Sequence, residues 1–396
     1  MTILLSVLTF LVIFSILVIG HEFGHFLFAR RAGMKVEEFG FGLPPRMWGK
    51  KTSRLISYQD KSGRFRKKKE TMIWSFNWIP FGGFVKILGE DDDSKEAKKD
   101  PRSFGNRPIL ARILFVLGGV LVNFLIGWLL LIIVFTSGSQ PIVTSPADIE
   151  KNIQQGIITT IDGVQIIEVT DRSVAKEAGL LDGDIIVSVD NKNIKKADDL
   201  INKLKEKPRG EGFHINVKRI EARNRKKNLT YIIKPNKEGK IGVILNPLPV
   251  IDEIHKIKLP LHKATIFALK ETGRISVLTV KMLGNVIVNI AKKFSVPEEV
   301  GGPVMIAKMT HDFVKIGDVI QIMIFMALIS ISLAVVNIMP FPALDGGRLL
   351  FLLFELITRK KPNAKWEAAI HAGGFVILLG LIFLVTWNDI VRIFFN

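Results

Sequence analysis

The chain has no cysteine among its 396 residues, so disulfide bonds, thiol catalysis and zinc sites built from cysteine are excluded. Acidic residues are also scarce. The sequence has 37 Asp and Glu against 55 Lys and Arg, which gives a formal net charge of +18. Such an excess of positive charge favours contact with an anionic surface.

The mean hydropathy is +0.30, although 23% of the residues are charged. A soluble domain with so many charges would have a negative mean hydropathy, so the apolar residues must be concentrated in long runs. This composition is typical of a membrane protein with a water-exposed part. It excludes a plain globular enzyme, a disordered chain and a fibrous repeat. The expected partner of the positive charge is therefore the lipid bilayer, with no nucleic acid.

Four segments are long enough to cross a bilayer, which requires about 20 apolar residues. They are residues 1–29, 113–139, 319–344 and 368–388. The first is not expected to be a cleaved signal peptide, because it is too long and no basic residue precedes its apolar run. The sequence therefore predicts a polytopic α-helical membrane protein with about four transmembrane helices.

Basic residues flank these spans unevenly. Arg30 and Arg31 follow the first span, Arg107 and Arg112 precede the second, and three consecutive basic residues at 359–361 lie between the last two. Because positive charge is retained on the cytoplasmic side, both termini are expected to be extracytoplasmic. The long segment 140–318 then also lies outside, and the expected location is the inner or plasma membrane of the cell.

Part of this outer segment has the pattern of a small α/β domain. Predicted strands are 164–169, 185–189, 213–217 and 229–233, and predicted helices are 173–178 and 197–205. The run Ala-Gly-Leu-Leu-Asp-Gly-Asp-Ile-Ile at 178–186 resembles the signature of PDZ domains, which bind peptide ends by strand addition. The alternative is a small domain that binds no peptide.

The chemical signal is the run His21-Glu22-Phe23-Gly24-His25 at the inner end of the first span. Two histidines four residues apart share one helix face and can bind one metal ion, and the glutamate between them can accept a proton from water. Ionisable groups inside an apolar helix are costly and require a functional explanation. We therefore predict a Zn²⁺ site with His21 and His25 as ligands and Glu22 as the catalytic base.

Zinc at a catalytic site requires a third protein ligand. Asp345 is the best candidate, because two prolines and two glycines within 337–347 prevent a regular helix there. Distorted backbone at membrane depth is tolerated only when it is buried in protein or lines a polar cavity. Three other ionisable residues lie near the spans. Glu355 is expected at the interface, His371 is expected to be a hydrogen-bonded packing residue, and Asp389 is the remaining candidate.

The two motifs together resemble the site-2 protease family of intramembrane zinc metalloproteases. The resemblance extends over essentially the whole chain and is closest to the bacterial branch that carries a PDZ insert between its second and third core spans. Further matching runs are Phe-Gly-Phe-Gly at 39–42, Pro-Phe-Gly-Gly-Phe-Val-Lys at 80–86 and Gly-Gly-Pro-Val at 301–304. One departure is Gly118-Gly119 before Asn123, where many relatives have Gly-Pro.

The resemblance implies a role for each site residue. His21, His25 and Asp345 would bind zinc, Glu22 would be the catalytic base, and Asn337 would help to hold the substrate backbone. The spans, the residue patterns and the resemblance together predict the organisation of the chain. Residues 1–140 would form the first membrane half, 150–245 the PDZ-like domain, 250–318 an extracytoplasmic amphipathic segment and 319–396 the second membrane half.

Residues 72–88 are rich in aromatic and branched side chains and are broken by Pro80, Gly82 and Gly83. This pattern predicts a membrane-associated β-hairpin with its tryptophans at headgroup level. A substrate helix must unwind before hydrolysis, and each unpaired backbone group in lipid costs several kcal/mol. Our hypothesis is that the hairpin edge pairs with the unwound substrate, and the alternative is a simple interfacial anchor. The pairing residues would be Gly83, Phe84 and Val85.

The predicted function is therefore that of an intramembrane zinc metalloprotease. Its substrates would be single-span membrane proteins already trimmed outside, as in regulated intramembrane proteolysis, with the outer domain restricting access. A non-catalytic adaptor that binds peptides through its PDZ-like domain is the alternative, but it would not need both Glu22 and Asp345. A zinc transporter would need ionisable residues in the second and fourth spans, which have almost none.

Overall fold

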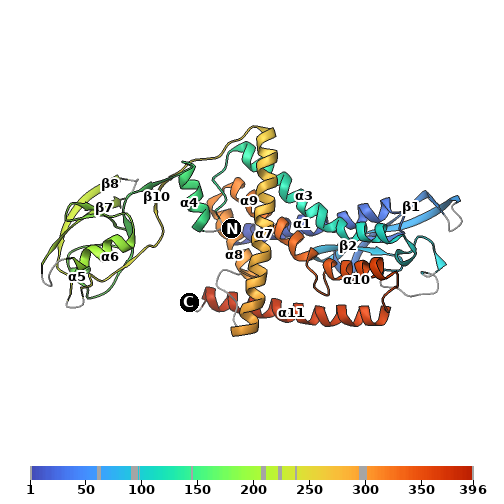
Figure 1. Cartoon of the computed structure of the whole chain (residues 1–396). Helices are drawn as coiled ribbons and strands as arrows, with labels where there is room; N and C mark the ends of the chain where they lie inside the picture. The colour runs from blue at the N-terminus through green and yellow to red at the C-terminus, as the bar shows by residue number, and fades with distance from the viewer. Residues whose placement is uncertain are drawn as a thin grey trace. The chain divides into compact units, whose positions relative to one another are not determined.

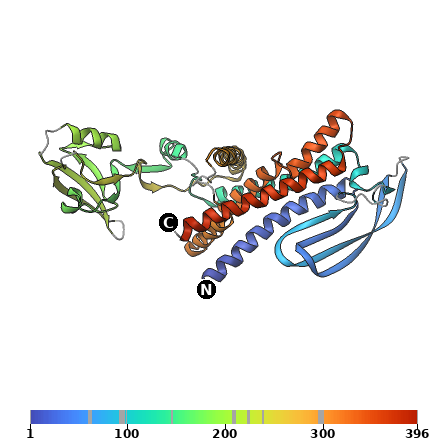
Figure 2. The ribbon, with the colours of Figure 1, turned by 90° about the horizontal axis from the view of Figure 1, so that it is seen from below.

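The computed structural model describes residues 2–59, 64–90, 97, 99–143, 146–206, 211–221, 225–236, 239–293 and 301–394. The chain forms two compact units. The first, called the membrane unit below, consists of Met1–Ser137 and Leu259–Asn396, and the second, called the insert, is Gly138–Lys258. Figures 1 and 2 show the ribbon of both.

Within the described residues, four helices are long and apolar enough to cross a membrane. The structure therefore agrees with the prediction of about four spans. The third ends at Ile338 rather than at residue 344, because the prolines at 340 and 342 cannot continue a helix. The helices are α1 (Thr2–Arg31), α3 (Ile109–Ser137), α9 (Val319–Ile338) and α11 (Ala364–Phe394).

Three further long helices lie among the described residues of the membrane unit. They are α7 (Leu261–Lys293), α8 (Pro303–Ile316) and α10 (Asp345–Thr358). The long helix α7 crosses the direction of α1, α3 and α11 instead of running along it, as both views show (Figures 1 and 2). It packs against α3, where the Trp128 indole donates a hydrogen bond to the Thr265 carbonyl at 3.1 Å.

Helix α10 is fixed to α3 by a partly buried ion pair. The Arg112 guanidinium donates to both carboxylate oxygens of Glu355, at 2.8 and 2.6 Å. Two parallel charge-assisted bonds give this contact a defined geometry. The bonded guanidinium also holds the pKa of the Glu355 carboxyl below its usual value. Because Asp345 is the first residue of the same helix, the pair helps to set where α10 lies beside α3.

The β-element consists of two long antiparallel strands, β1 (Val36–Gln59) and β2 (Phe65–Ile87). Residues 38–41 of β1 pair with residues 83–86 of β2 on one side and with 73–76 on the other. The prediction that residues 72–88 form a hairpin by themselves is therefore wrong. The two ends of that segment do not pair with each other, because the start of β1 lies between them.

This arrangement leaves residues 83–87 at an edge of the sheet. Among the described residues they pair only with the start of β1, so their second edge carries no strand. The β-element packs on the C-terminal half of α1, where Phe26 makes edge-to-face ring contacts with Phe39 and Trp74. The open edge thereby lies beside the helix that carries the His-Glu-x-x-His run.

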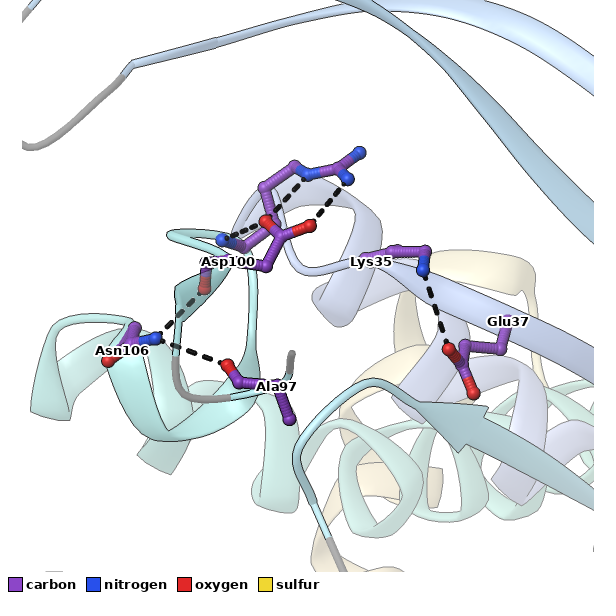
Figure 3. A network of polar contacts seen from close by, with 6 residues as sticks. Lys35, Glu37, Ala97, Asp100 and Asn106 are labelled. Atoms are coloured by element: carbon purple, nitrogen blue, oxygen red, sulfur yellow. Dashed lines mark hydrogen bonds and ion pairs between the residues drawn. The ribbon is translucent and has the colours of Figure 1, made fainter. Parts of the chain in front are cut away.

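The connection from β2 to α3 is held by a polar network (Figure 3). The Asp100 carboxylate accepts bonds from the backbone N–H and the guanidinium of Arg102, which is 2% exposed. The Asn106 amide donates to the Asp100 and Ala97 carbonyls. Since the Lys35 backbone N–H donates to the Arg102 carbonyl at 3.0 Å, the network fixes the segment after α1 to the turn that precedes α3.

The insert folds around its own apolar core. Its main sheet has the strand order β8-β7-β5-β4-β9, and β6 pairs with β5, while β3 and β10 form a separate pair. The helices are α4 (Pro146–Gln154), α5 (Val174–Glu177) and α6 (Ala197–Lys205). The strands are β3 (Ile158–Ile161), β4 (Val164–Val169), β5 (Ile185–Val189), β6 (Lys192–Asn193), β7 (Phe213–Glu221), β8 (Arg225–Ile233), β9 (Val243–Leu245) and β10 (Val250–Ile254).

The predicted elements of the insert are confirmed. Ser173 caps α5 by accepting a bond from the Lys176 N–H, and Leu200 of α6 is 1% exposed in the core. The fully buried Asp184 carboxylate accepts from the Arg219 guanidinium at 2.7 and 2.8 Å, which raises the pKa of Arg219. The tight turn before β5 is therefore held to β7 by a charge-assisted bond.

Candidate metal centre

His21 and His25 lie one turn apart on α1 and are 8% and 7% exposed. Their rings meet edge to face with centroids 4.7 Å apart, and their two Nε2 atoms are 3.1 Å apart. Side chains at i and i+4 share a helix face, which explains the convergence. Two aromatic nitrogens therefore point to one place inside the membrane unit.

Asp345 completes this cluster from a distant part of the chain. It begins α10, immediately after the broken stretch that follows α9. Its Oδ2 lies 3.1 Å from His21 Nε2 and 3.3 Å from His25 Nε2. The three ligand atoms all lie within 4.8 Å of one another. We refer to His21, His25 and Asp345 as the metal cluster.

The geometry of the metal cluster fits zinc. A tetrahedral zinc with ligands at about 2.0–2.1 Å places neighbouring ligand atoms about 3.3–3.4 Å apart. The observed separations of 3.1, 3.1 and 3.3 Å are close to that triangle. Asp345 Oδ2 is buried and accepts no hydrogen bond from the described residues, a cost that a cation would remove. The donor set of two imidazoles and one carboxylate leaves one position open, as catalytic zinc sites require.

Partners on α3 orient both imidazoles. His25 Nδ1 lies 2.9 Å from the Phe115 carbonyl, so Nδ1 carries the proton and Nε2 is free to bind a metal. His21 Nδ1 lies 3.4 Å from the Asn123 side-chain amide, which is 1% exposed. The Asn123 Oδ1 atom has no partner among the described residues. Rotating this amide so that Oδ1 faces Nδ1 gives the ring proton an acceptor and leaves His21 Nε2 free as well.

Helix α3 lies close to the two imidazole rings at Gly119, which has no side chain. A Cβ atom at position 119 would lie 2.5 Å from His21 Cε1 and 2.6 Å from His25 Nε2. A side chain added at this position would contact both imidazoles, so in this chain the two rings would have to shift to accommodate it. The Gly118-Gly119 run that departs from the family pattern thus forms one wall of the metal cluster.

Glu22 lies between the metal cluster and the open strand edge. The Val85 backbone N–H is a hydrogen-bond partner of its carboxylate. A Cβ atom at position 83 would lie 3.6 Å from Glu22 Cγ, so Gly83 is also a neighbour. The carboxylate is therefore placed between the ligands of a metal and a strand that can receive a peptide.

The remaining sequence candidates lie elsewhere. Asn337 is in the last turn of α9 and is half-buried, and no described hydrogen bond joins it to the metal cluster. The Phe84 ring packs across Gly40 of β1. Asp389 accepts bonds from the backbone N–H groups of Gly302 and Met305 at the start of α8. His371 accepts from the Ala343 N–H.

Sequence reasoning missed the residues that orient the ligands. The Phe115 carbonyl belongs to a backbone position that no side-chain pattern identifies. Asn123 could have been found, because it is a polar residue within the apolar run of the second span and such residues require a partner. Its buried Ser330 neighbour on α9 donates to the Asn123 carbonyl at 2.8 Å, which fixes α9 to the same turn of α3.

The chain as a whole matches one family of membrane-embedded metalloproteases. The profile of Peptidase family M50 matches residues 9–60 and 63–381. A protein named "Putative zinc metalloprotease" from Nostoc sp. is 32% identical over 394 residues, which are 96% of this chain and 95% of that protein. The Regulator of sigma-W protease RasP of Bacillus subtilis is 27% identical, with 98% and 99% covered. The chain therefore belongs to Peptidase family M50, the site-2 proteases.

Membership in this family fixes the class of the protein. It is a zinc metalloprotease and a multi-pass membrane protein, so the alternative of a non-catalytic adaptor is wrong. Among solved structures, crystal structures of PDZ domains from Listeria monocytogenes and Listeria innocua are similar to this chain. They are 26% and 27% identical, cover 22% of this chain and 90% and 94% of their own, and have a TM-score of 0.18.

Proposed function

We propose that the metal cluster holds the catalytic zinc and that Glu22 is the general base for hydrolysis of peptide bonds within transmembrane segments. The observation that carries this proposal is the convergence of three ligand atoms within 4.8 Å on helices of the membrane unit. The position of Glu22 beside both the cluster and an open strand edge supports it. The substitutions Glu22→Gln and Asp345→Ala test it, with cleavage and zinc binding measured for each.

The proposed chemistry divides between the metal and the protein. When bound, zinc polarises a carbonyl and lowers the pKa of water, which is the chemistry that peptide hydrolysis needs. Glu22 takes the proton of the attacking water and delivers it to the leaving nitrogen. The Phe115 carbonyl and the Asn123 amide hold His25 and His21 in the tautomer that binds metal.

The open edge at 83–87 is proposed to bind the unwound substrate by strand addition. The N–H and C=O of one residue in an antiparallel strand point to the same side, and this side alternates along the strand. Since the Val85 N–H faces Glu22, the backbone groups of Gly83 also point toward this side. These groups would replace the hydrogen bonds that a substrate helix loses on unwinding, and Asn337 is proposed to help to hold the substrate backbone.

Replacing Val85 by proline is expected to reduce cleavage about tenfold or more, because it removes the N–H that points to the open edge and bonds the Glu22 carboxylate there. Zinc content measured by mass spectrometry should stay at the wild-type level. Val85→Ala keeps the N–H and is expected to lose much less activity. Equal activity of Val85→Pro and the wild type would exclude strand addition at this residue.

The orientation of the chain in the cell membrane is part of the proposal. Basic residues flank the segments that are proposed to be cytoplasmic. By the positive-inside rule, this supports an extracytoplasmic location for both termini and for the insert. Because the chain has no cysteine, single cysteines can report the two sides. Lys195→Cys on the insert should react with an impermeant maleimide on intact cells, whereas Lys365→Cys, which precedes most of α11, should react only after permeabilisation. The reverse pattern would invert the proposed orientation.

The proposed substrates are single-span membrane proteins whose outer domains have already been removed. The relative in Bacillus subtilis is named for regulation of a sigma factor, which suits regulated proteolysis. The insert is proposed to exclude substrates with large outer domains, and its PDZ-like character is proposed from the 178–186 run. Deleting residues 156–234 should allow cleavage of an untrimmed substrate while cleavage of a trimmed one continues. If the untrimmed substrate stays intact and the trimmed one is cleaved, the insert is not a filter.

A further inference from the structure

A tight turn precedes the Asp345 ligand. The Leu344 N–H donates to the Phe341 carbonyl at 3.2 Å, so residues 341–344 form a β-turn with Pro342 second and Ala343 third. The φ angle of Ala343 is 77°. A hydrogen-bonded turn with proline second and a positive φ at the third position is a type II turn. The residue that directly follows this turn is Asp345.

Alanine is a poor residue for the third position of a type II turn. Its Cβ atom disfavours positive φ, and glycine or asparagine is normally found there. Proline followed by alanine suits a type I turn instead, in which the third residue has negative φ. The two turns differ mainly by a flip of the Pro342–Ala343 peptide. The direction of the Ala343 N–H therefore distinguishes one turn from the other.

The Ala343 N–H donates its hydrogen bond to a side chain of another helix. His371 on α11 accepts a hydrogen bond from Ala343 at its Nδ1 atom, at 3.0 Å. Its ring packs against Phe351 of α10 with centroids 5.6 Å apart. One turn further along α11, a Cβ at position 374 would lie 2.7 Å from the Pro342 carbonyl oxygen, so Gly374 lets α11 approach the turn closely. His371 Nδ1 therefore lies on the side of the turn to which a type II turn, but not a type I turn, directs the Ala343 N–H.

We propose that His371 is a positioning residue that selects the type II turn and thereby places the Asp345 carboxylate in the metal cluster. The inference rests on the proposed role of Asp345 as a zinc ligand. His371 is assigned a role through the turn and not on the substrate, because its Nδ1 accepts from the Ala343 N–H. The free energy of one hydrogen bond is used to keep alanine in a conformation that it otherwise avoids.

The size of the effect follows from the cost of the alanine conformation. A non-glycine residue with positive φ is disfavoured by about tenfold or somewhat more relative to its preferred conformations. Without His371 the type II turn should fall to a minor population. Apparent zinc affinity falls by the fraction of chains that keep the binding conformation, so we expect it to be about tenfold weaker in His371→Ala.

The test compares four full-length proteins in detergent: wild type, His371→Ala, Ala343→Gly and the double variant. Zinc affinity is measured by competition with a chromogenic chelator, and thermal unfolding is followed without metal. Ala343→Gly removes the penalty on positive φ, so the double variant should recover affinity to within about twofold of Ala343→Gly alone. His311→Ala is the matched control, since His311 also bonds a neighbouring helix through Nδ1, at Ser6.

The results can contradict the positioning role of His371 without contradicting the proposed zinc site. If His371→Ala binds zinc like the wild type, or if glycine at 343 restores nothing, the positioning role is wrong. If His371→Ala does not fold, recovery of a folded, zinc-binding double variant supports the proposal, and failure of both contradicts it. If the wild type itself binds no zinc, the proposed metal site fails and not merely the role of His371.

Discussion

Replacing Glu22 by glutamine is expected to reduce cleavage of a model single-span substrate by about 10²–10⁴-fold, the usual contribution of a general base. Glutamine has the shape of glutamate but cannot accept a proton, so the folded protein should stay intact. Zinc content should also stay at the wild-type level, because Glu22 is not one of the three residues whose ligand atoms converge. The measurement is cleavage by purified protein together with metal analysis of the same sample.

Glu150→Gln is the control for this substitution, since Glu150 is an exposed carboxylate on α4. It should leave both cleavage and zinc unchanged. Substantial cleavage by Glu22→Gln would show that another group accepts the proton. Loss of zinc in the same variant would mean that Glu22 acts as a ligand and not as a base.

Replacing Asp345 by alanine is expected to abolish both cleavage and tight zinc binding. Removing a group that merely orients a ligand costs about 10–100-fold in metal affinity, and removal of a ligand itself should cost more. The two histidines would remain on α1, but no carboxylate would meet them from α10. Zinc affinity by chelator competition and cleavage of the same substrate give the two readouts.

Asp312→Asn on α8 is the matched control, because Asp312 is an exposed carboxylate of the same unit. The pattern across variants separates the two roles. Glu22→Gln should keep zinc and lose catalysis, whereas Asp345→Ala should lose both. Wild-type zinc affinity in Asp345→Ala would require a different third ligand.

The spans and the motif could be predicted from the sequence because each depends on local information. Hydrophobic length identifies a membrane helix, and a spacing of four residues places His21 and His25 on one face. Asp345 could be predicted from the sequence for a different reason, since prolines and glycines in a span indicate distorted backbone that must be buried. The convergence of Asp345 with the histidines is a tertiary fact that the sequence alone only suggested.

The rest depends on contacts between distant segments. The start of β1 pairs between two parts of β2, and no periodicity in residues 72–88 indicates that a third segment enters there. The conformation of Ala343 is contrary to its intrinsic preference and is imposed by His371 from another helix. Local propensity fails at such positions, which occur close to the site where the geometry is most constrained.

The central claim is that a zinc ion is held inside the membrane unit by His21, His25 and Asp345. The most direct measurement is anomalous X-ray scattering at the zinc edge from crystals of the purified full-length protein. We predict a single strong peak about 2.0–2.2 Å from Nε2 of both histidines and from an Asp345 carboxylate oxygen. A peak bound elsewhere, or an Asp345 carboxylate that faces away from the two imidazoles, would contradict the account.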